Sequence, residues 1–153
     1  MPGGYKVSDD GKLLFVKWQG SLSDQRVIDH VGERFQDSRL HDGPTEAIDL
    51  RSAVVDTGVA NNTHLDNVND LATAYARVMT VIRIAKILII VPDQRMFEFA
   101  SQFRLLMANR GVDVILFSST QSLSYFLPHS SEELEKIFTG IHISDTGELR
   151  RQA

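Results

Sequence analysis

Two hydrophobic patterns alternate along this chain. Continuous apolar runs rich in β-branched residues occupy positions 84–91 and 112–117, and such runs are typical of strands buried on both faces. Between them, apolar residues recur every three or four positions from Met96 to Met107, which is the period of an amphipathic helix. A strand, a helix and a strand in this order predict a parallel βαβ unit with a right-handed crossover.

The N-terminal part predicts a hairpin followed by further α/β units. Strands are expected at 5–8 and 13–18, because an Asp-Gly turn separates them. In the second strand both faces are apolar, with Leu14, Val16 and Trp18 on one and Leu13, Phe15 and Lys17 on the other. This strand should therefore lie inside the sheet. Further along the chain, the patterns predict a helix at 23–35, a strand at 45–50 and a helix at 63–79. After the strand at 112–117 they predict a short helix at 122–127, capped by Thr120, and a last helix after Ser130.

Taken together, the elements predict an α/β fold. We expect a mixed, mostly parallel sheet of about five strands, with an N-terminal antiparallel hairpin and helices packed on it. Residues 1–143 should form a single domain, because this length suits one hydrophobic core. Residues 144–153 are mainly polar and are expected to form a C-terminal tail.

Composition excludes several classes of function. The net charge of −4 gives no electrostatic reason to bind nucleic acid. The chain has no cysteine, so thiol nucleophiles, disulfides and cysteine-ligated metals are excluded. Its apolar runs are too short to span a bilayer, and its first residues do not resemble a signal peptide, so we expect a cytoplasmic protein without an integral membrane segment. We expect no metal and no cofactor.

A polar site could form where the parallel strands end, since ligands of open α/β sheets bind outside these carboxyl ends. The residues that follow the strands there are Asp49, Arg51, Ser52, Asp93, Arg95, Ser118, Ser119 and Thr120. Two of the segments also begin helices, whose free N–H groups favour an anion. The alternative is structural: Asp93 and Thr120 would cap helices, and Arg51 would pair with Asp49 or Asp93.

The sequence contains no catalytic signature. Its five histidines lie on separate elements or loops without the spacing of a zinc site, and there is no nucleophile elbow, phosphate-binding loop or dinucleotide fingerprint. Two apolar residues, Phe97 and Leu105, lie off the buried stripe of their helix, and they indicate either a subunit contact or an apolar pocket. Exposed single apolar residues are also common, so both could simply be surface positions.

Four segments occur in an order that resembles a known family. They are the end of the hairpin at 18–23, the strand ending in Ile48-Asp49-Leu50-Arg51, the strand at 83–91, and the strand at 114–117 with its following short helix. This order, over roughly residues 5–127, resembles the STAS-like proteins, in the branch of bacterial anti-sigma-factor antagonists that is grouped with lipid-binding SEC14-like domains.

The resemblance implies a regulatory domain and a phosphorylated hydroxyl group. In the antagonists, a serine in an Asp-Ser-Ser-Gly-like turn is phosphorylated by a partner kinase. This chain has Asp56-Thr57-Gly58 near that place, one residue short, so Thr57 is the first candidate for phosphorylation and Ser52 is the second. The alternative is that these hydroxyl groups only shape a turn.

We therefore expect a non-catalytic, STAS-like binding or regulatory domain. Its partner would be another protein or a small apolar or lipid-like ligand. The alternative from another class is a small enzyme, or an anion site, that uses Asp49, Arg51, Asp93 and Ser118 at the carboxyl edge. A homo-oligomer with Phe97 and Leu105 at the contact is a third hypothesis.

Overall fold

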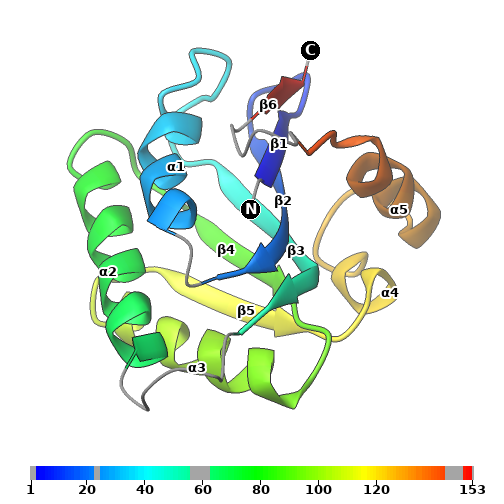
Figure 1. Cartoon of the computed structure of the whole chain (residues 1–153). Helices are drawn as coiled ribbons and strands as arrows, with labels where there is room; N and C mark the ends of the chain where they lie inside the picture. The colour runs from blue at the N-terminus through cyan, green and yellow to red at the C-terminus, as the bar shows by residue number, and fades with distance from the viewer. Residues whose placement is uncertain (1–2, 23–24, 56–62, 144–149, 153) are drawn as a thin grey trace.

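The protein folds as one mixed sheet with helices on both faces (Figure 1). The computed structural model describes residues 3–22, 25–55, 63–143 and 150–152. The strands are β1 (Gly3–Val7), β2 (Leu13–Ser21), β3 (Thr45–Val54), β4 (Lys86–Ile90), β5 (Asp113–Phe117) and β6 (Arg150–Gln152). Their order across the sheet is β5-β4-β3-β2-β1-β6, which places β2 and β3 at the centre.

The strand directions agree with the predicted fold class. Strands β2, β3, β4 and β5 are mutually parallel, while β1 pairs with β2 in an antiparallel hairpin. The predicted α/β fold with a mostly parallel sheet is thus confirmed. One segment of the expected tail adds a strand, because β6 pairs in parallel with β1.

Five helices in the described residues cover the sheet. They are α1 (Gln25–Phe35), α2 (Thr63–Val78), α3 (Gln94–Ala108), α4 (Thr120–Leu123) and α5 (Ser131–Gly140). Helices α1, α2 and α3 lie on one face, and α4 and α5 lie on the other (Figure 1). The predicted βαβ unit is therefore present as β4-α3-β5, with α3 crossing on the same face as α1 and α2.

Each face of the sheet has its own core, as the alternation in β2 predicts. Leu14, Val16 and Trp18 belong to the larger core beneath α1, α2 and α3. Phe15 belongs to the smaller core beneath α4 and α5, while Lys17 on the same face reaches the carbonyl oxygen of Phe138 at 3.4 Å. Because β2 carries apolar side chains on both faces, it lies inside the sheet, as expected.

Two helix starts differ in how well the sequence predicted them. The capping box before α5 is confirmed: Ser130 accepts a hydrogen bond from the N–H of Glu133, whose carboxylate accepts one from the N–H of Ser130. The predicted cap of the preceding short helix was wrong by one position. Ser119, not Thr120, is the N-cap of α4, because its side chain accepts from the N–H of Ser122.

Candidate binding cavity

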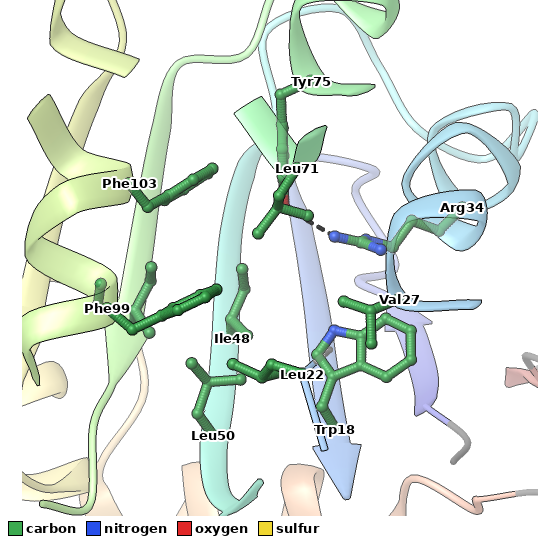
Figure 2. Close-up of a pocket in the computed structure, with 12 residues that line it drawn as sticks. Trp18, Leu22, Val27, Arg34, Ile48, Leu50, Leu71, Tyr75, Phe99 and Phe103 are labelled. Atoms are coloured by element: carbon green, nitrogen blue, oxygen red, sulfur yellow. Dashed lines mark hydrogen bonds between the residues drawn. The ribbon is translucent and has the colours of Figure 1, made fainter. Parts of the chain in front are cut away.

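An apolar cavity lies between the sheet and helices α1, α2 and α3 (Figure 2). About 410 Å³ is free of protein atoms when the open mouth is included, and the centre of a water-sized sphere can reach about 30 Å³ of it. The residues that line it are Trp18, Leu22, Val27, Arg34, Ile48, Leu50, Leu71, Tyr75, Ile89, Phe99, Ala100 and Phe103. The cavity is therefore lined mainly by hydrocarbon and is partly open, and in this structure it has room for a few water-sized molecules.

The spacing of these residues in β3 and α3 explains why their side chains meet. Ile48 and Leu50 are two positions apart in β3, so both project to the same face of the sheet. Phe99 and Phe103 are four positions apart in α3 and project back toward them. Between these two rings along the helix, Ala100 contributes only a methyl group to the lining. The cavity is consequently walled by aromatic rings where α3 approaches the sheet (Figure 2).

Arg34 brings a charge to this apolar lining. Its Nε donates to Oε2 of Glu46 at 2.7 Å, and its Nη2 donates to the Tyr75 hydroxyl at 2.7 Å. The Tyr75 hydroxyl in turn donates to Oε1 of Glu46. Three side chains from α1, β3 and α2 thus form a closed ring of hydrogen bonds in the core, and all three are almost fully buried.

Burial and the hydrogen bonds of this ring shift the pKa values of Tyr75 and Arg34. Burial raises the pKa of Tyr75 well above its ordinary value, so the hydroxyl keeps its proton. Burial alone would lower the pKa of Arg34, but attraction to Glu46 and the hydrogen bonds outweigh it and raise that pKa. Arg34 also lies with its Cζ 5.8 Å from the ring centres of Trp18 and Tyr75, close enough for cation–π attraction.

Trp18 lines the cavity, and its indole also packs against His30 and Gly3. Its indole stacks on the imidazole of His30, with the ring centres 6.0 Å apart and the planes 9° apart. Gly3 on β1 leaves room for the indole, since a Cβ there would lie 2.4 Å from Trp18 Cε3. Burial lowers the pKa of His30, so the stacked ring is held in its neutral form at neutral pH. The cavity wall is therefore fixed by contacts from two other elements.

Asp49, Arg51 and Ser52 were expected where a strand at 45–50 ends, but they lie within β3, which continues to Val54. Arg51 forms a forked pair with Asp49, with Nε to Oδ1 at 2.9 Å and Nη2 to Oδ2 at 3.0 Å. It also bonds Glu135 on α5, with Nη2 to Oε1 at 2.6 Å. These contacts raise the pKa of Arg51 and lower that of Glu135. The expected pairing of Arg51 with Asp49 is thus present, and Glu135 completes it.

The remaining edge residues lie at helix starts or on the surface. Asp93 is the N-cap of α3, where Oδ1 accepts from the N–H of Met96 at 2.9 Å. Thr120 is buried, and its hydroxyl contacts that of Ser131 at 2.9 Å. Ser52, Arg95 and Ser118 are exposed. None of the eight edge residues lines the apolar cavity, and their joint use as a site stays a prediction.

The other predicted positions are surface residues or fall outside the description. Phe97 and Leu105 on α3 are 44% and 69% exposed, as their place off the stripe predicts. Their role as a subunit contact stays a prediction. Thr57, the first candidate for phosphorylation, lies outside the described residues. Ser52, the second candidate, has an exposed side chain on β3.

Arg34, Glu46 and Tyr75 were not predicted from the sequence as a group. Two signals could have indicated them. Arg34 follows Val27 and Val31 at helical spacing, so a cation stands on the apolar side of α1. Glu46 stands at an inward position of β3, two residues before Ile48. Opposite charges at two core positions predict a buried pair, because an isolated buried charge is very unfavourable.

The described residues form neither a metal site nor a membrane-spanning helix. Among the residues whose positions the structure describes, no group of three or more His, Cys, Asp or Glu could hold a metal ion. Likewise, no helix in the described ranges is long and apolar enough to cross a membrane. Comparison of the chain with protein-family models, with curated proteins and with solved structures gave no match.

Proposed function

We propose that this protein is a non-catalytic binding domain that holds a small apolar ligand between its sheet and helices α1, α2 and α3. The observation that carries this proposal is the cavity itself, whose lining is apolar apart from the polar groups of Arg34 and Tyr75. Pockets of this composition bind ligands mainly by removing apolar surface from water. Because a water-sized sphere reaches only about 30 Å³ of the cavity, its lining side chains have to move apart to admit even a compact ring compound or a short chain, and a long lipid would not fit.

The binding can be tested with a probe that the chain already contains. Trp18 is the one tryptophan of the sequence and lines the cavity, so its indole N–H gives a single assignable NMR signal. We expect this signal to shift on titration with at least one of four small aromatic compounds: acetophenone, indole, ethylbenzene and benzoate. If none of the four moves the signal at any soluble concentration, the proposal fails.

A matched pair of variants separates the cavity from the rest of the surface. Ala100→Leu places three additional carbon atoms in the cavity lining, whereas Ala108→Leu adds the same atoms at an exposed position of the same helix. We expect Ala100→Leu to abolish the shift of the Trp18 signal and Ala108→Leu to preserve it. Equal binding by both variants would place the ligand elsewhere and would contradict the proposal.

A second candidate function is regulated binding of a protein partner, in line with the resemblance to STAS-like antagonists. It is supported by Ser52, whose exposed hydroxyl on β3 is accessible to a kinase. A phosphate there would add negative charge next to the ion pair of Arg51 with Asp49 and Glu135. Substitution Ser52→Glu should then change the affinity for such a partner, and Ser52→Ala should not.

A further inference from the structure

Trp18 stacks on a buried histidine, one of whose ring nitrogens has no partner. The imidazole of His30 lies against the indole with the ring centres 6.0 Å apart and the planes 9° apart, and its side chain is only 8% exposed. Nε2 lies 3.5 Å from Oε2 of Glu33, whereas Nδ1 is buried and has no hydrogen-bond partner among the described residues. The neutral ring tolerates this position, because one of its two nitrogens carries no hydrogen.

The protonated form of His30 fits the same position poorly. In the imidazolium ion both nitrogens carry hydrogen, so Nδ1 would be a buried donor without an acceptor. The indole would attract this cation, but the guanidinium of Arg34 already lies 5.8 Å from the centre of the indole, and the two cations repel each other. Burial and the charge of Arg34 lower the pKa of His30, although Glu33 and Asp29 oppose them.

The groups that approach His30 from the sheet side carry no free negative charge. Its ring rests on the indole of Trp18 in β2, which offers a donor but no acceptor. Near the indole, Arg34 is paired with Glu46 of β3 and donates to the Tyr75 hydroxyl of α2. Because the carboxylate of Glu46 already bonds Arg34 and Tyr75, it does not serve as the counter-charge of an imidazolium.

The acids that favour protonation lie on the solvent side of α1. Asp29 and Glu33 are exposed and raise the pKa of His30, whereas the exposed Arg26 lowers it. The side chain of Glu33 is 61% exposed, with its carboxylate close to Nε2. An imidazolium that turns outward keeps this carboxylate as a partner and gains water for Nδ1. Protonation therefore favours a ring position in solvent over the position on the indole.

We propose that His30 is a pH-dependent latch on the cavity: when it is protonated in mild acid, its ring leaves Trp18, and the indole becomes free to move and to admit a ligand. The cavity requires such a movement, because its lining side chains have to move apart before even a compact ring compound fits. For the ligand this inference rests on the proposed function, but the release of the indole is a property of the protein alone.

The single tryptophan makes the release measurable without a ligand. Trp18 is only 3% exposed, so acrylamide should quench its fluorescence poorly while the stack is intact. We expect the quenching constant to rise several-fold as the pH falls below 6.5, with the same midpoint as the His30 imidazole in an NMR titration. A flat quenching profile between about pH 7.5 and 5, or two different midpoints, overturns the proposal. A rise that coincides with loss of the far-UV circular dichroism signal also overturns it, since unfolding then exposes the indole.

Three variants separate the latch from general effects of acid. His30→Phe keeps a ring against the indole but has no proton to gain, so quenching should stay low at every pH. Glu33→Gln removes a carboxylate that raises the pKa of His30, so the midpoint should move to lower pH. His142→Gln changes an exposed histidine elsewhere and should keep the wild-type profile. A wild-type response in His30→Phe contradicts the latch; if that variant does not fold, the midpoint of Glu33→Gln decides.

Ethylbenzene, which has no titratable group, connects the latch with the cavity. We expect it to bind the wild-type protein several-fold more tightly below the midpoint than above it, because the indole is then already released. Equal affinity on both sides of the midpoint overturns the latch, while the cavity remains a binding site. If quenching responds to pH but ethylbenzene binds on neither side, the use of the cavity for this ligand fails and the release of Trp18 stands.

Discussion

Nε of Arg34 lies 2.7 Å from Oε2 of Glu46, and both side chains are almost completely buried. The pair joins helix α1 to strand β3, with Glu46 lying between Leu14 of β2 and Ile87 of β4 in the sheet. A buried pair gains little over a hydrocarbon pair of the same shape, but breaking it leaves one charge uncompensated. The two residues should therefore respond very differently to single and double substitution.

Glu46→Gln should be strongly destabilising. The substitution keeps the shape but leaves the charge of Arg34 buried without a counter-ion, so we expect the free energy of unfolding to fall by about 3–5 kcal/mol. Urea unfolding followed by circular dichroism measures this. The double variant Arg34→Met with Glu46→Leu should be more stable than Glu46→Gln alone. Glu98→Gln on the exposed side of α3 serves as the control and should stay within about 0.5 kcal/mol of wild type.

Asp93 provides a test of whether an edge residue serves only as a cap. Because Oδ1 of Asp93 accepts from the N–H of Met96, Asp93→Ala should cost about 1 kcal/mol and Asp93→Ser almost nothing. Thermal unfolding of the two variants gives the comparison. Equal losses of stability in both variants would contradict the capping role.

The ion pair of Arg51 and Glu135 predicts a small stability change that depends on pH. Hydrogen bonding to Arg51 lowers the pKa of Glu135 below its ordinary value of 4.5. The folded state therefore favours the carboxylate, and its stabilisation is present above pH 4.5 and is lost as pH falls through the lowered pKa. At pH 7, Glu135→Gln should cost no more than about 1 kcal/mol, because the pair is partly exposed. Wild type and variant should converge in acid; a constant difference would contradict this origin.

The buried imidazole of His30 predicts a second pH-dependent change in stability, near neutral pH. Burial lowers its pKa in the folded state below the ordinary 6.5, so the unfolded chain binds a proton more readily. Stability should then decrease as pH falls through 6.5 toward the lowered pKa. Nearby Glu33, with Oε2 3.5 Å from Nε2, opposes the shift without reversing it. In His30→Phe, which keeps a ring against Trp18, urea unfolding between pH 7.5 and 5.5 should show a flatter profile.

Regular hydrophobic patterns were sufficient to predict most of the fold. The βαβ unit of β4, α3 and β5 follows from two β-branched runs with a helical stripe between them, and the two faces of β2 follow from its alternation. Strand β6 was not predictable in this way. Its residues are two arginines and a glutamine, and what makes them a strand is backbone pairing with β1. Such pairing leaves no hydrophobic signal in the sequence.

The candidate cavity was harder to predict than the fold. The sequence placed Phe99 and Phe103 in the core correctly, but the cavity depends on how far α3 stands from β3, which periodicity does not specify. The hydrogen bonds among Arg34, Glu46 and Tyr75 join residues 12, 29 and 41 positions apart. These groups meet because of the register of β3 in the sheet and the way in which α1 and α2 pack on it. The polar residues after the strands gave a clearer sequence signal, yet they line no part of this cavity.

Gly3 gives the first strand an influence over the shape of the cavity wall. Its missing side chain is what lets the Trp18 indole occupy its place beside His30. A methyl group at position 3 would overlap the six-membered part of the indole, so the ring or strand β1 would have to shift. Variation at position 3 would thus alter the cavity through Trp18, although Gly3 itself is not one of the lining residues.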